Sequence, residues 1–259
     1  MTPEDRVTTP GGASSPPPLR VLGEPEALRL AGLDGAGAGG AGEAPTLHLG
    51  STTDAVDVVW LPGPATGTEP AGSRVIATGG DRLWSRAPWP AADVLFELPP
   101  APEPLALIAG GDEERRAHAA GKLSERGLPV RSAEELTADD LAAATVVALL
   151  GDAGAATPEQ PWVATAMPAE APAVLAARRV LIAPRSAVTF GLLPGTDHLA
   201  FGTYDDVVQY ADAALTFPDS FEPFRALGAR TAERHRASLV YARLADELRS
   251  APRSAAPRG

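Results

Sequence analysis

Short runs of apolar residues alternate with amphipathic stretches through the second half of this chain. The runs LALIA (105–109), TVVALL (145–150) and VLIAP (180–184) are continuously apolar, as in strands that are buried on both faces. Stretches with helical periodicity separate them, which is typical of a parallel sheet with right-handed crossover connections. The pattern therefore predicts an α/β fold over residues 105–249, with a Rossmann-like parallel sheet flanked by helices.

Helix-start and helix-stop signals support this alternation. The segment 112–127 begins with three acidic residues and ends at Gly127, which predicts a helix. Ser132, Thr137 and Thr203 are each followed three residues later by Glu or Asp, the pattern of a capping box. Further predicted elements are a short strand at 129–131, helices at 169–177 and after Thr203, and a long closing helix over 225–248 with an apolar stripe.

The first hundred residues are richer in proline and glycine and show weaker periodicity. They predict a disordered leader (1–18), a small helix-poor N-terminal α/β domain (19–98) and a stiff proline-rich linker (99–104). A disordered tail is expected at 250–259. Within the N-terminal domain, a strand at 19–22 followed by a helix is expected, and then short β-like runs at 46–49, 55–61, 74–78 and 92–98.

Composition narrows the classes of function. The net charge of −11 argues against a broad nucleic-acid-binding surface. There is no cysteine, and the four histidines lack metal-ligand spacing, so no metal site is expected. The longest apolar run is far shorter than the roughly 18 residues of a membrane span. The N-terminus lacks the pattern of a secretory signal, so a cytoplasmic protein is expected.

Two glycine-bearing turns are candidate ligand sites, because ligands of such sheets bind beyond the carboxyl ends of the strands. Gly110 and Gly111 follow the strand LALIA and would let a phosphate approach the backbone; a tight strand-to-helix turn is the alternative. Gly191 and Gly195 lie in the loop FGLLPGTD (190–197), which is also consistent with a simple turn. Arg185, with Arg178 and Arg179, lies near that loop in sequence and could neutralise phosphate charge.

The segments LLPGTDHLAF, TYDDVVQYAD and ERHRASLVYARL resemble the donor-sugar half of GT-B glycosyltransferases, in particular the group-1 and CgeB-like spore-coat enzymes. That resemblance covers residues 105–249. It implies a reduced GT-B arrangement, with the smaller N-terminal domain in the place of the acceptor half. It also implies a nucleotide-sugar substrate, with no separate cofactor and no metal, and His235 falls where the family has a histidine.

The chain departs from the family pattern E-A-x-A-x-G-x-P-V/L-I at two positions. When VLAARRVLIAP is aligned to it, the glutamate that binds the donor ribose is replaced by Ala173, and the glycine that ends the helix is replaced by Arg178. Glu170 lies one turn earlier, about 4.5 Å by helix rise, and is the candidate for the ribose contact. The alternative is that Glu170 is a solvated first-turn residue favoured by the helix dipole.

The catalytic group is not identified from sequence. Asp57, Asp81 and His48 are the available candidates, and their spacing does not distinguish them from surface residues. Trp60, Trp84 and Trp89 could form a sugar-stacking platform or could simply pack in a core. Three functions remain open: a glycosyltransferase using a nucleotide-sugar donor, a non-catalytic GT-B-like scaffold or partner subunit, and an unrelated Rossmann-like binding domain. The acceptor and any protein partner are left open.

Overall fold

The computed structural model describes residues 90–151, 163–188 and 191–240, together with the backbone of four short strands nearer the N-terminus. These four strands form a parallel sheet in chain order. They are β1 (Arg20–Leu22), β2 (Thr46–Leu49), β3 (Val58–Leu61) and β4 (Arg74–Ala77). The strands predicted at 46–49, 55–61 and 74–78 are thus confirmed to within three residues at each end.

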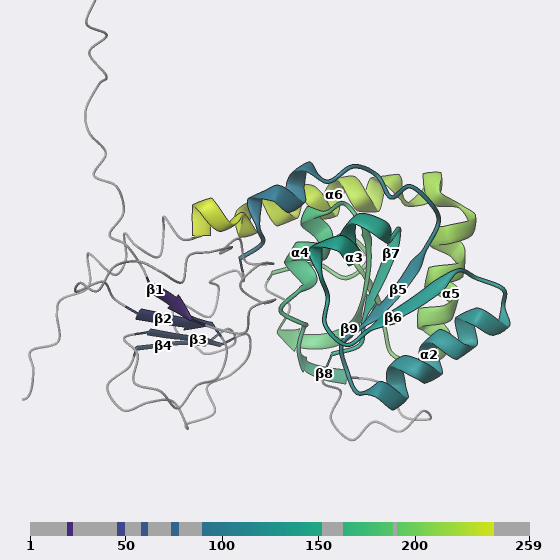
Figure 1. Ribbon diagram of the computed structural model, residues 1–259, viewed down its shortest axis with the longest axis horizontal. Coiled ribbons are helices and arrows are strands. Elements are labelled where there is room, and N and C mark those ends of the chain that lie inside the picture. Colours follow the sequence, from purple (N-terminus) through teal and green to yellow (C-terminus); the bar gives the residue numbers. More distant parts are fainter. Residues whose placement is uncertain are drawn as a thin grey trace, which may run out of the picture.

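The C-terminal domain alternates strands and helices as the sequence predicts (Figure 1). Its strands are β5 (Ala106–Ala109), β6 (Val130–Ala133), β7 (Val146–Leu149), β8 (Val163–Ala166), β9 (Val180–Val188) and β10 (Leu199–Phe201). Its α-helices are α2 (Glu113–Glu125), α3 (Ala138–Ala143), α4 (Ala171–Ala176), α5 (Tyr204–Thr216) and α6 (Glu222–Ala232). Three 3-10 helices complete the described elements: η3 (Asp93–Glu97), η4 (Pro218–Phe221) and η5 (Glu233–His235).

Five strands form one parallel sheet in the order β10-β9-β7-β5-β6. Numbered along the chain, these five strands run 2-1-3-4-5, one of the two common doubly wound orders. β8 pairs in parallel with the second half of β9, with Val163 opposite Arg185. The predicted α/β fold with a parallel sheet is confirmed. The strand order reverses between β5 and β7, which makes that pair the topological switch point.

Helices cover both faces of this sheet, which explains why its strands are continuously apolar (Figure 1). On one face, η3, α3, α4 and α6 pack against the sheet around Leu107, Leu149 and Leu181. On the other face, α2 and α5 pack around Ile108, Ile182 and Phe201. Every residue of β5 and β7 is buried. The apolar residues of α5 that the sequence assigns to one face are also buried: Val207, Val208, Ala211, Ala214 and Leu215.

Local capping signals correctly locate three helices. The Asp112 side chain accepts a hydrogen bond from the Arg115 amide at the start of α2. Thr137 and Thr203 form complete capping boxes with the acidic residues three positions later. The capping box predicted at Ser132 is wrong, because β6 extends to Ala133 and Ser132 is paired in the sheet.

Two other predictions are corrected. The run 92–98 is not a strand: it contains the 3-10 helix η3, and its Leu95 is buried in the core of the C-terminal domain. The closing helix is interrupted after α6 by η5, because Ala91 pairs with the chain there. The Ala91 amide donates to the His235 carbonyl (2.7 Å), and the Ala237 amide donates to the Ala91 carbonyl (2.8 Å). The predicted apolar stripe is also interrupted, since Leu227 and Leu239 are exposed.

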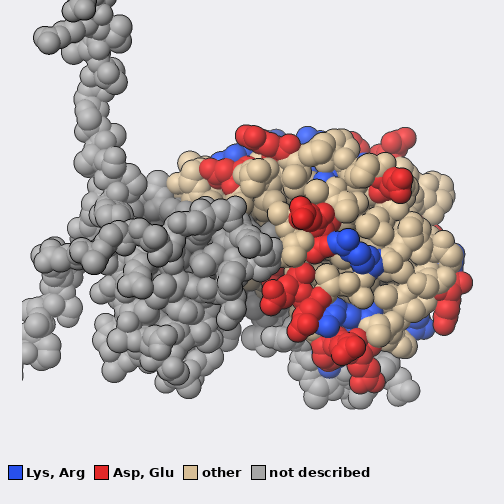
Figure 2. Space-filling view, in the orientation of Figure 1, with Lys and Arg blue, Asp and Glu red and all other residues tan. Residues whose placement is uncertain are grey.

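Acidic side chains are spread over the face of the domain seen in Figure 2, with basic ones placed between them. In the described ranges, no helix combines the length and apolarity needed to cross a bilayer. Within those same ranges, no three His, Cys, Asp or Glu side chains are grouped so that they could hold a metal ion.

Candidate functional site

The switch point between β5 and β7 is bordered by three glycines with left-handed backbone. Gly110 and Gly111 follow β5 with φ values of 71° and 68°, and Gly151 follows β7 with φ 63°. A Cβ atom on Gly111 would lie 3.1 Å from the Leu150 Cβ, and one on Gly110 would lie 3.6 Å from the Gly151 nitrogen. The positive φ therefore favours glycine at both positions, and at 111 a Cβ would also approach the Leu150 side chain too closely.

Two arginines lie at this carboxyl edge. Arg116, in the first turn of α2, donates a hydrogen bond from Nη1 to the Gly111 carbonyl (2.5 Å). Arg185, in the second half of β9, is exposed, and its Nε lies 3.8 Å from where a Cβ on Gly202 would be. The sequence identified Arg185 but missed Arg116. Arg116 reaches the Gly111 carbonyl only because packing fixes the direction of α2, and the sequence does not show that direction. Both are suited to binding phosphate oxygens.

The helix N-termini at this edge are already capped by carboxylates. Asp112 caps α2, as described above, and Asp206 accepts hydrogen bonds from the amides of Gly202 (2.8 Å) and Thr203 (3.0 Å). An incoming phosphate would have to displace these carboxylates to reach the helix amides. A phosphate at this edge would therefore be bound by Arg116 and Arg185 and not by helix dipoles, and these arginines lie beside the carboxylates of Asp112 and Asp206.

Gly191 and Gly195 lie in a loop that is tied to α6 and the turn after it. The Gly191 carbonyl accepts a hydrogen bond from Arg234 Nη2 (2.6 Å). Asp197, which is buried, accepts from the Leu193 amide (2.8 Å) and from the Thr231 hydroxyl (2.7 Å). These contacts favour the alternative of a structural turn for this loop, since its polar groups are bonded to the loop itself and to the C-terminal segment.

His198 ends this loop and is almost completely buried, at 1% exposure. Burial lowers the pKa of its imidazole to about 4, against a smaller opposing effect of the Asp197 charge. Among the residues that the structure describes, none is a hydrogen-bond partner for its buried Nδ1 atom. The imidazole is therefore neutral at pH 7 and contributes to packing.

Glu170 lies at the N-cap of α4, where its backbone carbonyl accepts hydrogen bonds from the amides of Ala173 (2.9 Å) and Val174 (3.1 Å). Two residues earlier, the Pro168 ring lies 3.1 Å from where a Cβ on Gly151 would be. The residues just before α4 therefore pack against the switch point. Three of the six residues predicted to bind the ligand lie at the carboxyl edge: Gly110, Gly111 and Arg185. A fourth, Glu170, is the N-cap of α4 and comes two residues after Pro168, which packs against Gly151 at this edge.

The end of α4 has a left-handed backbone at a position that is not glycine. The Arg178 amide donates to the Leu175 carbonyl (3.0 Å), and the Arg179 amide donates to the Val174 carbonyl (3.1 Å). These two bonds form a Schellman motif, in which the residue at the position of Arg178 adopts left-handed backbone and is usually glycine. Arg178 has φ 56° and is the only non-glycine residue of the described ranges with positive φ.

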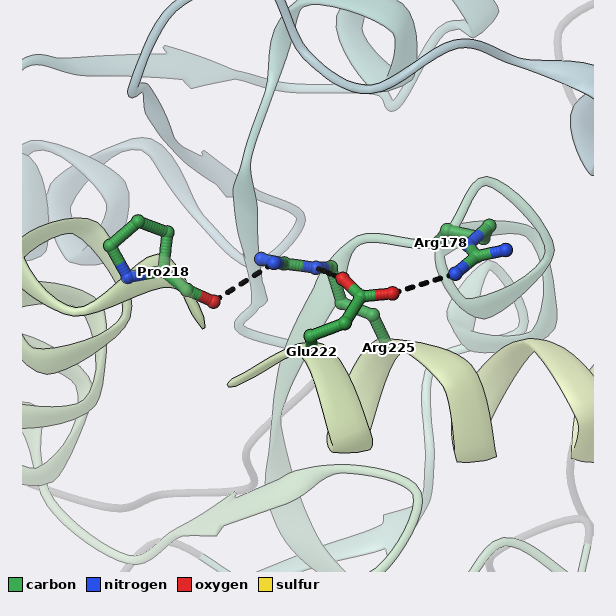
Figure 3. Close-up of polar contacts among 4 residues, drawn as sticks. All are labelled: Arg178, Pro218, Glu222 and Arg225. Atoms are coloured by element: carbon green, nitrogen blue, oxygen red, sulfur yellow. Dashed lines mark hydrogen bonds and ion pairs between the residues drawn. The ribbon is translucent and has the colours of Figure 1, made fainter. Parts of the chain in front are cut away.

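The side chain of Arg178 is held by an ion pair. Its Nη2 lies 2.7 Å from Glu222 Oε1 at the start of α6, and Arg225 Nε donates to the other Glu222 oxygen (2.9 Å), as Figure 3 shows. Both arginines hold the pKa of Glu222 below its usual value. Arg178 and Arg179 precede β9 and lie at its amino end, so the prediction that they neutralise phosphate beside Arg185 is wrong: the two arginines and the glycine turns lie at opposite edges of the sheet.

His235 is completely buried in η5. The other candidates fall outside what the structure describes. These are Phe190, Asp81, Trp84 and Trp89, and the side chains of His48, Asp57 and Trp60. Comparison with models of known protein families gave no match. Comparison with curated proteins gave none either.

Proposed function

We propose that the C-terminal domain binds a nucleotide-activated sugar at the carboxyl edge of its sheet, as the donor half of a GT-B-like glycosyltransferase would. The observation that carries the proposal is the left-handed position of Arg178. The family pattern has a glycine at this point, between a helix and a buried strand. Arg178 has φ 56° at the end of α4, directly before β9, and this is the backbone conformation that such a glycine would adopt.

The carboxyl edge supplies groups suited to a nucleotide diphosphate. The turns of Gly110 and Gly111 expose backbone at the switch point, where ligands of doubly wound sheets bind. Arg116 and Arg185 would contact the phosphate oxygens, and their charge would stabilise a diphosphate leaving group without a metal ion. In the full proposal, the N-terminal region provides the acceptor side of a reduced GT-B arrangement.

A non-catalytic role as a scaffold or partner subunit is the second candidate, and Ala173 favours it. With the pattern aligned at Arg178, the ribose-binding glutamate is replaced by Ala173, which is 2% exposed and packed in the core. Glu170 lies one turn earlier, at the N-cap. A domain that lacks the ribose contact would bind donors weakly, so its fold could serve another subunit.

Thermal-shift titration of the full chain with UDP, GDP, dTDP and their sugars tests the proposal. We expect one nucleotide series to raise the melting temperature by mass action, and Arg185→Ala to reduce that shift. Arg230→Ala is the matched control, because Arg230 is an exposed arginine on α6 whose loss changes the net charge equally. No shift with any nucleotide would favour the scaffold role. Where binding is found, release of free nucleotide from the bound sugar nucleotide would distinguish a transferase from a binding protein.

A further inference from the structure

A groove of about 630 Å³ lies at the amino edge of the sheet, opposite the glycine turns. Its position follows from its lining, since Pro104, Thr145 and Arg179 shortly precede β5, β7 and β9. The apolar part of its wall comes from Phe96, Leu98 and the prolines of the connector, Pro100, Pro102 and Pro104. Its volume is in the range of small-molecule sites.

The groove has a buried cation in its wall. Arg179 is 3% exposed and donates hydrogen bonds to the backbone carbonyls of Leu141 (2.6 Å), Pro99 (2.7 Å) and Ala142 (3.4 Å). These bonds use Nε and Nη2. In the part of the chain that the structure describes, no carboxylate pairs with Arg179, and Nη1 makes no hydrogen bond. A buried charge is costly unless it is paired, so this guanidinium is suited to an anionic partner.

Two more guanidinium groups line the same groove. Arg225 and Arg178 share the single carboxylate of Glu222, as Figure 3 shows, and the Arg225 side chain is only 16% exposed. The charge of Arg225 also lowers the pKa of Arg179, after the larger effect of burial. Close like charges of this kind repel one another when the groove is empty and are stabilised when an anion is bound between them.

The acidic residues of the groove do not cancel this charge at depth. Glu97 and Glu103 also line it, but both are exposed, where water and salt screen their charge. Glu222 sets one negative charge against the positive charges of Arg178 and Arg225, which leaves one of the two in excess. The inner wall is cationic beside a proline-rich and aromatic surface.

We propose that this groove binds an oxyanion, a phosphate monoester or a carboxylate, carried on a ring or other apolar body. The oxyanion contacts Nη1 of Arg179 and Nη1 of Arg225, whose Nε and Nη2 donate to Glu222 and to the Pro218 carbonyl. The body packs on Phe96 and the connector prolines. Charge-assisted hydrogen bonds to two arginines provide affinity for the anion, and the apolar wall selects the body. The ligand would contact both the connector and the sheet domain.

Isothermal titration of the full chain with phenyl phosphate, inorganic phosphate and phenol tests this site. We expect phenyl phosphate to bind more tightly than either fragment, because only it uses both parts of the groove. Benzoate in place of phenyl phosphate distinguishes carboxylate from phosphate ligands. Equal binding of phenol and phenyl phosphate, or no binding of either anion, would overturn the proposal.

Two variants with opposite expected effects on affinity test whether phenyl phosphate binds in this groove. Arg225→Met leaves the hydrogen bonds of Arg179 intact and should weaken phenyl phosphate about tenfold or more. Glu222→Gln removes the carboxylate that competes for Arg225 and should tighten phenyl phosphate binding. This variant tests the site even if Arg225→Met fails to fold. Arg230→Met is the control that should leave binding unchanged, because Arg230 is exposed on α6 and does not line the groove. Unchanged affinity in both Arg225→Met and Glu222→Gln, or loss in Arg230→Met, would overturn the site.

Discussion

The left-handed backbone of Arg178 makes a prediction that reverses an ordinary rule of helix stability. At most helical positions, alanine is more stable than glycine, because glycine has more conformational freedom to lose. At Arg178 the backbone has φ 56°, which is unfavourable for any residue with a Cβ. We therefore expect Arg178→Gly to be more stable than Arg178→Ala, although both remove the same ion pair with Glu222.

The magnitude follows from three terms. Relief of the left-handed conformation contributes about 1–2 kcal/mol to the glycine variant. The greater freedom of glycine in the unfolded chain costs about 0.4–1 kcal/mol. Both variants lose an ion pair whose side chains are 52% and 50% exposed, which is worth about 0.2–1 kcal/mol. The glycine variant should thus be close to the wild type, and the alanine variant about 1 kcal/mol below the glycine variant.

Urea unfolding of the two variants measures this difference directly. Gly121, which is exposed in the middle of α2, provides the matched control. Apart from its own helix, no described part of the chain lies within 4 Å of where a Cβ would be. At this position Gly121→Ala should raise the free energy of unfolding by about 1 kcal/mol, the ordinary order of the two residues. An Arg178→Ala variant as stable as Arg178→Gly, with the control behaving normally, would refute the left-handed position.

Three further predictions follow from the turns, the caps and the buried histidine. Gly111→Ala should lower the free energy of unfolding by about 1–2 kcal/mol, because φ is 68° and the new Cβ would meet the Leu150 Cβ; thermal denaturation measures this. Thr137→Ala should cost about 1 kcal/mol through loss of the α3 cap, and a cost near zero would argue against the capping box. Because burial lowers the pKa of His198 to about 4, the unfolded chain takes up a proton below about pH 6.5 that the folded protein excludes. The free energy of unfolding should therefore be greatest above about pH 6.5 and lower by about 2 kcal/mol at pH 5. Urea unfolding at about pH 7.5 and pH 5 measures this difference, and His198→Phe should remove it.

The elements of the C-terminal domain could be predicted because their signals are local. Apolar runs mark the buried strands, and Thr137 and Thr203 mark helix starts through side chains that bond their own first turn. The same signal is wrong at Ser132, where pairing with β5 outweighs the cap. Local sequence patterns therefore locate elements only where no tertiary contact competes for the same backbone.

The candidate site was less predictable, because it depends on which strand ends meet. The glycines of the two turns were visible in the sequence, but their contact follows from β5 and β7 being neighbours in the sheet. Arg178 and Arg179 are close to Arg185 in sequence, yet they precede β9 while Arg185 lies in its second half. The burial of Arg179 in the wall of the amino-edge groove could not be predicted for the same reason: the carbonyls that hold it come from 37 to 80 residues earlier in the chain.

The most direct test of the proposed function is to map nucleotide binding on the ¹⁵N-labelled full chain by NMR. Titration with UDP, GDP and dTDP in turn should shift the amide signals of Gly110, Gly111 and Gly151 with one of them, and Arg185→Ala should abolish these shifts. A titration in which no nucleotide shifts those three signals, or in which the shifts are confined to residues around Arg179, would contradict a donor site at the switch point.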